Sequence, residues 1–208
     1  ESWVPYQQLT STGPDDQLGT SVAITWFGGD AYIAVGAPGA RSDQTAGGTV
    51  YVYQWDSTTQ WATLRWTLTE DGFIGDTSAF GEAVAIDTRA DGTIVVAVGN
   101  PWYAPQAYGC VEIHSLFNLS GFYYSYMESR LVPSLETLDP WAIEQLGYAG
   151  SSVDLDGGRV IIGAPITIAT RNRQGSAFVY ESTELSTGLW EWSLEDCLLS
   201  AQPESYAF

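Results

Sequence analysis

Short apolar segments separated by turn residues follow one another along the chain. Three of them, 32–35, 94–98 and 160–162, are almost continuously apolar, which predicts strands buried on both faces. Others mix aromatic and polar residues, as in 61–69 and 190–199. Gly, Pro, Asp and Ser mark the turns between these segments. The pattern therefore predicts an all-β chain.

Three landmarks recur in the same order, three times. The first is a Gly that opens a short strand, the second is a strand that ends in Gly-Ala-Pro or Gly-Asn-Pro, and the third is a Gly before a further strand. They stand at 19–22, 35–38 and 48–53, at 81–84, 98–101 and 109–114, and at 150–153, 162–165 and 175–180. Copies lie roughly sixty to seventy residues apart, which indicates a repeat architecture.

Each repeat predicts four strands, and hairpin-like turns at 56–60 and 118–121 join the last two. A unit of this length with a doubly buried strand is typical of a β-propeller blade. We expect a β-propeller built of four-stranded antiparallel blades, with about three blades present. The predicted parts are a leading strand 1–18, blade 1 at 19–70, blade 2 at 81–135, an insertion at 136–149, blade 3 at 150–200 and the start of a fourth repeat at 201–208.

Closed propellers need at least four blades, so three units leave two blade faces without neighbours. We expect the chain to be part of a larger propeller. Two alternatives stay open at this point. Other copies of the chain complete the ring, or the units stack as an open array.

The repeat resembles the FG-GAP repeat, which builds the β-propeller of integrin α-subunits and of many extracellular proteins. Leu18-Gly19 and Phe80-Gly81 match its first element, and the Gly-Ala-Pro stops at 36–38 and 163–165 match its second. The third repeat departs from the pattern, because Ala149 stands where Phe is expected. The resemblance implies the fold. Such propellers serve adhesion, glycan binding and enzyme appendages alike.

In integrin-type repeats the turn between the first two strands carries a calcium loop, and calcium needs six to eight oxygen ligands. The first repeat offers one acid there. The second offers Asp87 and Asp91, with the cation of Arg89 between them. The third offers Asp154 and Asp156 on a short turn. None is a complete loop, so we expect the calcium-free variant, with Asp and Gly supplying turn geometry and no cofactor.

The net charge is −18, and the seven basic residues include no lysine. This charge disfavours nucleic acids and anionic membrane surfaces, and it suits a soluble extracellular protein. No apolar run approaches the ~20 residues that span a bilayer, so no membrane insertion is expected. No secretory leader opens the sequence, which implies that any signal peptide is removed or lies outside this segment.

No catalytic motif is present, and the only histidine, His114, has no second histidine and no catalytic Ser or Cys motif beside it, so we expect it to be a packed or a surface residue. We therefore expect no enzyme activity. Asn118-Leu119-Ser120 is a glycosylation sequon in a predicted hairpin, which makes Asn118 a candidate for glycosylation. Cys110 and Cys197 fall on outer strands of neighbouring blades and can form a disulfide only if their Cα atoms approach within about 7 Å.

The insertion predicts one short helix or turn at 139–147, with Asp, Pro and Gly at capping positions. Because insertions on a propeller face often carry binding, its Trp141 is a candidate contact residue. Trp102, Tyr103 and Tyr108 form a second candidate patch in the loop after the second strand of blade 2. Packing in the core or at the rim is the alternative role for both sets.

The function we expect is that of a non-enzymatic extracellular structural or adhesion module that contacts other proteins, or further copies of itself, through its rim loops. One alternative is a glycan-binding propeller that uses aromatic loop residues such as Trp102 and Tyr103 against sugar rings. A second alternative is a propeller appendage of an enzyme whose catalytic domain lies outside this segment.

Overall fold

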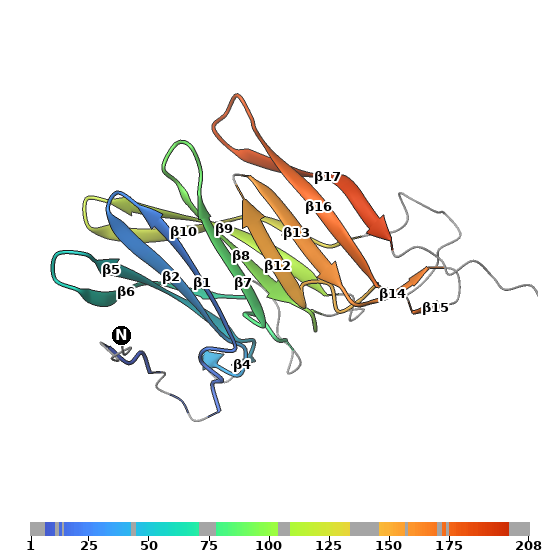
Figure 1. Ribbon diagram of the computed structural model, residues 1–208, viewed down its shortest axis with the longest axis horizontal. Coiled ribbons are helices and arrows are strands. Elements are labelled where there is room, and N and C mark those ends of the chain that lie inside the picture. Colours follow the sequence, from blue (N-terminus) through green and yellow to red (C-terminus); the bar gives the residue numbers. More distant parts are fainter. Residues whose placement is uncertain are drawn as a thin grey trace, which may run out of the picture.

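Three four-stranded antiparallel sheets make up most of the protein, and in each the strands follow chain order (Figure 1). The computed structural model describes residues 7–10, 13, 15–42, 45–70, 78–103, 109–133, 146–156, 158–169, 172–173 and 175–199. None of these residues is helical. The expectation of an all-β chain with three four-stranded units is confirmed at this level.

The N-terminal sheet contains β1 (Ser21–Phe27), β2 (Asp30–Ala37), β5 (Thr49–Asp56) and β6 (Trp61–Thr69). The middle sheet contains β7 (Ala83–Thr88), β8 (Ile94–Asn100), β9 (Cys110–Leu119) and β10 (Phe122–Leu131). The C-terminal sheet contains β12 (Ser152–Asp156), β13 (Arg159–Ala164), β16 (Ser176–Glu184) and β17 (Trp190–Leu199). Short strands in the connections are β3 (Arg41–Ser42), β4 (Thr45–Ala46), β11 (Leu146–Gly147), β14 (Ile166–Ala169) and β15 (Asn172–Arg173).

The strands predicted at 61–69 and 190–199 coincide with β6 and β17. Two other predictions need correction. The short helix or turn expected at 139–147 lies largely outside the described residues, but its last two residues form β11, which pairs with β14. In the expected leading strand, residues 7–10 are not in a strand, although the Gln7 side chain bonds both the N–H and the C=O of Ala62 in β6.

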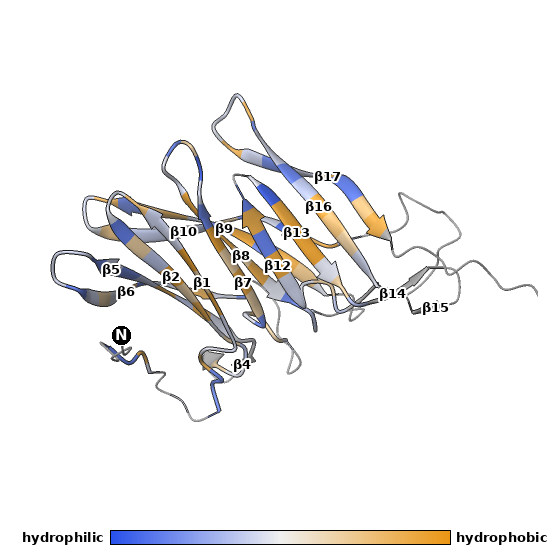
Figure 2. Ribbon diagram, viewed as in Figure 1, coloured by the Kyte–Doolittle hydropathy of each residue, from blue (hydrophilic) through white to orange (hydrophobic). Residues whose placement is uncertain are grey.

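The three sheets stack face to face, and an apolar layer lies between each neighbouring pair. One cluster joins the N-terminal and middle sheets through residues such as Val52, Trp66 and Val96. A second joins the middle and C-terminal sheets. Every residue of β8 is buried, whereas β13 alternates between buried and exposed positions. Figure 2 shows the hydrophobic residues along the strands in the middle of the stack. Of the three segments predicted to be buried on both faces, only 94–98 in β8 is therefore fully buried, whereas 32–35 and 160–162 each contain exposed or half-exposed residues.

The first strand of each sheet lies beside the first strand of the next, because β1 contacts β7 and β7 contacts β12. A hydrogen bond from the Val84 N–H to the Ser21 Oγ, 2.9 Å long, joins β7 to β1. These three strands line an open groove of about 630 Å³. The sheets thus share one inner edge, while the β5–β6, β9–β10 and β16–β17 hairpins lie away from it.

Glycines let the backbones of neighbouring sheets touch at this inner edge. We call Gly19, Gly81 and Gly150 the leading glycines; each has φ near +90° (93°, 94° and 89°) and donates a hydrogen bond within its own sheet. The Gly81 carbonyl oxygen lies 2.0 Å from where a Cβ on Gly36 would be. The Phe80 carbonyl oxygen lies 2.1 Å from the same point on Gly48. Any side chain at Gly36 or Gly48 would therefore separate the sheets.

The second junction repeats this geometry. The Gly150 carbonyl oxygen lies 2.0 Å from where a Cβ on Gly99 would be. The Ala149 carbonyl oxygen lies 2.1 Å from the same point on Gly109. We call Gly36, Gly48, Gly99, Gly109 and their counterparts Gly163 and Gly175 the receiving glycines. Ala149 is fully buried like Phe80, so the departure from Phe-Gly keeps the backbone contact and changes only the side chain.

Replacing Gly36 by Ala should destabilise the fold by about 3 kcal/mol, because the new methyl group overlaps a backbone oxygen that only a shift of the sheets can move. Urea unfolding followed by tryptophan fluorescence measures the change. Gly47→Ala is the matched control, because its Cβ would meet only Glu70 Oε2, at 3.7 Å. Equal stability of the two variants would contradict the close junction.

Candidate functional site: junction networks and the β9–β10 hairpin

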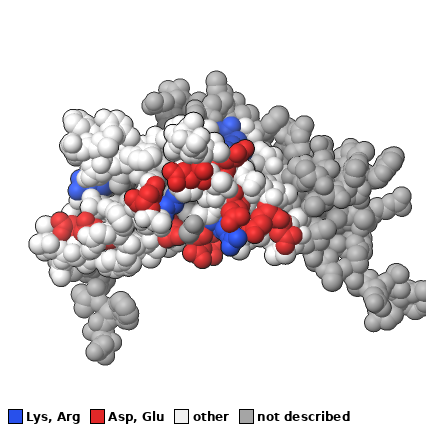
Figure 3. All heavy atoms as spheres, turned by 90° about the horizontal axis from the view of Figure 1, so that it is seen from above, with Lys and Arg blue, Asp and Glu red and all other residues white. Residues whose placement is uncertain are grey.

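The acidic residues considered for calcium do not converge. Asp154 and Asp156 are exposed on β12. Asp91 accepts a 2.8 Å hydrogen bond from the Thr93 N–H, the turn role expected of it. Within the described ranges, no three His, Cys, Asp or Glu side chains are placed to hold a metal ion. The face shown in Figure 3 gathers acidic side chains with a few arginines among them.

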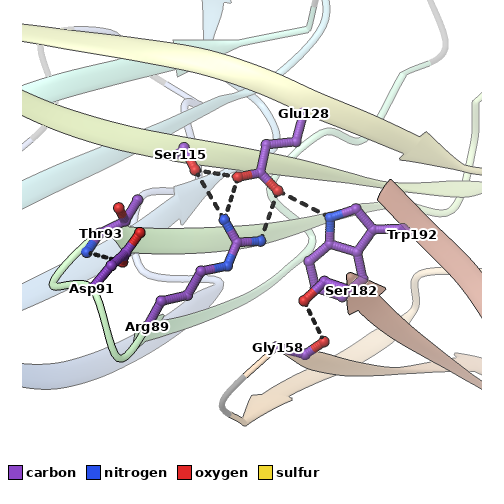
Figure 4. Close-up of polar contacts among 8 residues, drawn as sticks. All are labelled: Arg89, Asp91, Thr93, Ser115, Glu128, Gly158, Ser182 and Trp192. Atoms are coloured by element: carbon purple, nitrogen blue, oxygen red, sulfur yellow. Dashed lines mark hydrogen bonds and ion pairs between the residues drawn. The ribbon is translucent and has the colours of Figure 1, made fainter. Parts of the chain in front are cut away.

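Arg89 leaves its turn and inserts between the middle and C-terminal sheets (Figure 4). Its guanidinium pairs with both oxygens of Glu128, at 2.5 and 2.8 Å, and the two side chains are 4% and 3% exposed. Ser115 donates to the same carboxylate, and Trp192 Nε1 donates to it at 3.0 Å. The Arg89 guanidinium also lies 4.0 Å from the centre of the Trp190 ring. The residue that stands where a calcium ligand is expected thus supplies the junction's own buried cation.

The hydrogen bonds in this network set the charge of Glu128. Burial acts to raise its pKa, but the bonds from Arg89, Ser115 and Trp192 together hold the pKa below its ordinary value. Glu128 therefore stays ionised beside Arg89. The hydrogen bond from Trp192 to Glu128 and the contact of the Arg89 guanidinium with the Trp190 ring link this buried pair of the middle sheet to the C-terminal sheet.

A second polar cluster lies between the N-terminal and middle sheets. Glu112 is fully buried and binds Arg130 at 2.6 and 2.9 Å and His114 Nε2 at 3.2 Å. His114 also packs edge-on with the Phe80 ring, so the lone histidine is a packed residue. A cavity of about 230 Å³ borders His114 and Glu70.

Glu70 is the unusual member of this region. Both of its carboxylate oxygens are buried without a hydrogen-bond partner among the described residues. Burial raises its pKa above the ordinary value; the nearby hydroxyl of Ser78 offsets part of that rise, and the Glu112 carboxylate adds to it. Its ionised form is therefore a cost to the folded state at neutral pH.

The loop residues that were predicted as contact residues have different roles in the structure. Trp102 is 46% exposed and packs edge-on against Tyr148, with ring centres 4.7 Å apart. Tyr103 turns inward, where its ring lies under the Arg130 guanidinium and its hydroxyl accepts a 3.0 Å hydrogen bond from it. Tyr108 and Trp141 lie outside the described residues. Cys110 and Cys197 are free thiols, and Cys110 is buried.

One face of the β9–β10 hairpin is an exposed apolar surface that the sequence analysis did not predict. Cross-strand pairing sets Leu119 opposite Phe122 and Phe117 opposite Tyr124, with Tyr126 next along the strand. We call these five residues the hairpin face; their exposed fractions are Phe117 39%, Leu119 65%, Phe122 67%, Tyr124 52% and Tyr126 54%. The alternation of Phe122, Tyr124 and Tyr126 was the available signal.

The hairpin is held in shape by its turn. Ser120 and Gly121 both have positive φ, 55° and 87°, as a tight two-residue β-hairpin turn requires. Asn118 Oδ1 accepts a 2.9 Å hydrogen bond from the Gly121 N–H. Asn118 is exposed and pairs with Tyr123. Because side chains alternate along a strand, Asn118 points away from the hairpin face, and a glycan there would leave that face open.

Comparison with known proteins places this chain in no group. No protein-family model matches the sequence, and a search of curated proteins finds no match. The described residues also contain no helix long and apolar enough to cross a membrane.

Replacing Glu128 by Gln should cost about 3 kcal/mol of folding free energy at pH 7, because Arg89 loses its buried counter-charge. A carboxylate whose pKa is lower in the folded than in the unfolded protein stabilises the fold at pH values above its unfolded pKa, which is about 4.3 for Glu. This stabilisation is lost as the pH falls through the folded pKa. The variant should therefore lose less stability than wild type on acidification. Urea unfolding across pH measures this, with the exposed Glu191→Gln as control. Identical pH profiles for variant and wild type would contradict the network.

Replacing Glu70 by Gln should act in the opposite direction. A carboxylate whose pKa is higher in the folded than in the unfolded protein destabilises the fold at neutral pH. This cost disappears as the pH falls through the folded pKa toward the unfolded pKa of about 4.3. The Glu70→Gln variant should be more stable than wild type at pH 7, with an advantage that shrinks on acidification. The same unfolding series measures it. A variant less stable than wild type at pH 7 would show that the carboxylate has a partner.

Proposed function

We propose that the chain is a β-propeller segment that serves outside the cell as a non-enzymatic adhesion or assembly module, with the hairpin face as its contact surface. The propeller is supported by the order of the strands in each sheet and by the inner strands β1, β7 and β12 side by side around an open groove. The resemblance of the repeats to FG-GAP repeats supports the same reading.

The single observation that carries the contact surface is the hairpin face itself. It has five large apolar side chains, three of them aromatic residues of β10, on a hairpin away from the inner edge of the stack. Aromatic residues are enriched at protein interfaces because they bury large areas at low conformational cost. An exposed apolar cluster on a hairpin closed by a tight hydrogen-bonded turn suits a preformed docking surface.

The proposal of an extracellular setting rests on the net charge of the chain and on the exposed side chain of Asn118. A net charge of −18 without lysine favours solubility and repels anionic surfaces. The exposed sequon residue Asn118 lies on the side of the hairpin away from the hairpin face, so a glycan and a bound protein can coexist there.

Glycan binding is the second candidate, and the exposed ring of Trp102 favours it. Sugar rings stack on exposed aromatic faces, and Trp102 is held by Tyr148 in a defined orientation. Tyr103 offers less than the sequence indicated, because Arg130 occupies both its ring and its hydroxyl. An appendage to an enzyme remains the third candidate, with the chemistry in another domain.

The proposal is tested by binding to immobilised extracellular matrix proteins and to a glycan array. The triple variant Leu119→Ser/Phe122→Ser/Tyr124→Ser should weaken protein binding about tenfold or more, because interface energy concentrates in a few aromatic anchors. Its folding should be unaffected, since all three side chains are exposed.

The control is Leu185→Ser/Leu189→Ser, which removes exposed apolar residues of a different hairpin, 39% and 53% exposed. Protein binding that the triple variant retains in full would overturn the hairpin face as the contact surface. Binding to glycans alone, abolished by Trp102→Ala, would favour the second candidate instead.

A further inference from the structure

Glu70 borders a cavity between the outer strands of the N-terminal and middle sheets. The cavity has a volume of about 230 Å³, and residues 67–69 of β6, His114 of β9, and Ser125 and Met127 of β10 complete its wall. Pockets for drug-sized ligands typically measure about 300–1,000 Å³, so this one suits a small ligand or the end of one side chain.

The charged groups next to the cavity leave one carboxylate without a cation. Arg130 Nε and Nη2 both bond Glu112 Oε1, at 2.9 and 2.6 Å, and its Nη1 donates to the Tyr103 hydroxyl at 3.0 Å. Glu112 and Arg130 also act electrostatically on Glu70, so the three groups are neighbours. Both oxygens of Glu70 are nevertheless buried without a hydrogen-bond partner among the described residues.

The other buried glutamate of the stack shows what satisfies such a group. Both oxygens of Glu128 accept hydrogen bonds from the Arg89 guanidinium, at 2.5 and 2.8 Å. A guanidinium presents parallel N–H groups that match the two oxygens of a carboxylate, whereas an ammonium is a point charge. A metal ion is not favoured, because the described part of the chain offers no three His, Cys, Asp or Glu side chains that could hold one.

The described arginines do not supply this partner. Each of those with a described side chain bonds another residue, namely Arg65, Arg89, Arg130 and Arg159. A partner for Glu70 must therefore come from outside the described residues.

We propose that the Glu70 cavity binds a guanidinium group, carried by a small molecule or by an arginine side chain. Rotation about the side-chain bonds of Glu70 brings its carboxylate from the buried position into the cavity that the same side chain borders. The carboxylate then exchanges an unpaired buried state for a bidentate ion pair, which is the source of the affinity.

The cavity and the hairpin face lie on opposite sides of β10. Tyr123 packs against Trp66 of the N-terminal sheet, with ring centres 5.0 Å apart. Because side chains alternate along a strand, Ser125 and Met127 share that side with Tyr123, and the aromatic residues of the hairpin face point the other way. A ligand in the cavity therefore does not compete with a protein on the hairpin face, and either proposal can fail alone.

The charge of Glu70 should give this binding a pH dependence. Burial raises the pKa of Glu70, while a guanidinium stays charged at every pH of interest, so affinity should fall as Glu70 takes up a proton on acidification. Glu112, His114 and Cys110 of β9 and Arg130 of β10 are the other ionisable groups of this junction. A Glu70→Gln variant keeps all four, so its comparison with wild type isolates the contribution of Glu70.

Calorimetric titration of the native chain near neutral pH tests the proposal. The probes are acetyl-arginine amide, acetyl-lysine amide and the uncharged isostere acetyl-citrulline amide. The arginine probe should bind at one saturable site, the lysine probe about tenfold more weakly, and the citrulline probe not at all. Glu70→Gln should weaken binding of the arginine probe about tenfold or more, because it removes a charge-assisted pair. The exposed Glu191→Gln, with the same change in net charge, should bind like wild type.

A short glycine peptide with one central arginine distinguishes the two sources of the guanidinium. Binding about tenfold tighter than that of the arginine probe identifies an arginine side chain of a protein as the ligand, and equal or weaker binding identifies a small molecule. No binding of either arginine compound to wild type, equal binding of the arginine probe and either other probe, or unchanged binding by Glu70→Gln would overturn the proposal. The triple variant of the hairpin face should bind the arginine probe like wild type.

Discussion

Close approach of a backbone carbonyl to a glycine is the contact on which the stacking of the sheets depends. At each junction two carbonyl oxygens of one sheet occupy the space of two missing Cβ atoms in the sheet before it. The apolar layers can then close, because the inner edges are no further apart than backbone atoms allow. The same contact explains why the repeat keeps glycine at three fixed positions while the side chains between them vary.

Away from the shared inner edge, polar side chains are buried between the sheets. The two junctions differ in how fully these side chains are hydrogen-bonded. In the network of Arg89 and Glu128 with Ser115 and Trp192, both carboxylate oxygens of Glu128 are hydrogen-bonded, although the Arg89 Nε has no partner among the described residues. The region around Glu70 is less satisfied, because both oxygens of its carboxylate are buried without a described partner. The first network therefore adds specificity to the stacking of the middle and C-terminal sheets, and the second lowers stability at neutral pH.

The strands and their grouping into three four-stranded antiparallel sheets were predictable from the sequence, because the signals for them are local and repeated. Doubly buried β8 appears as an uninterrupted apolar run, and the ends of β6 match the predicted boundaries. The sites were less predictable, because they depend on which side chains meet across a junction. The sequence showed Arg89 only as a cation at a position where a calcium ligand is expected, because its partner Glu128 lies 39 residues away on another strand. Nothing in the sequence around Tyr103 indicated that the Arg130 guanidinium would contact its ring and its hydroxyl.

Hydrogen–deuterium exchange of the native protein, resolved by peptide, tests the central claim most directly. If a sister sheet covers each face of the middle sheet, β8 can open only when the whole stack unfolds, whereas the outer sheets can open separately. The amides of β8 should then exchange the slowest in the chain, and those of β2 and β13 measurably faster. Equal exchange rates in β8 and β13 would contradict a middle sheet enclosed on both sides.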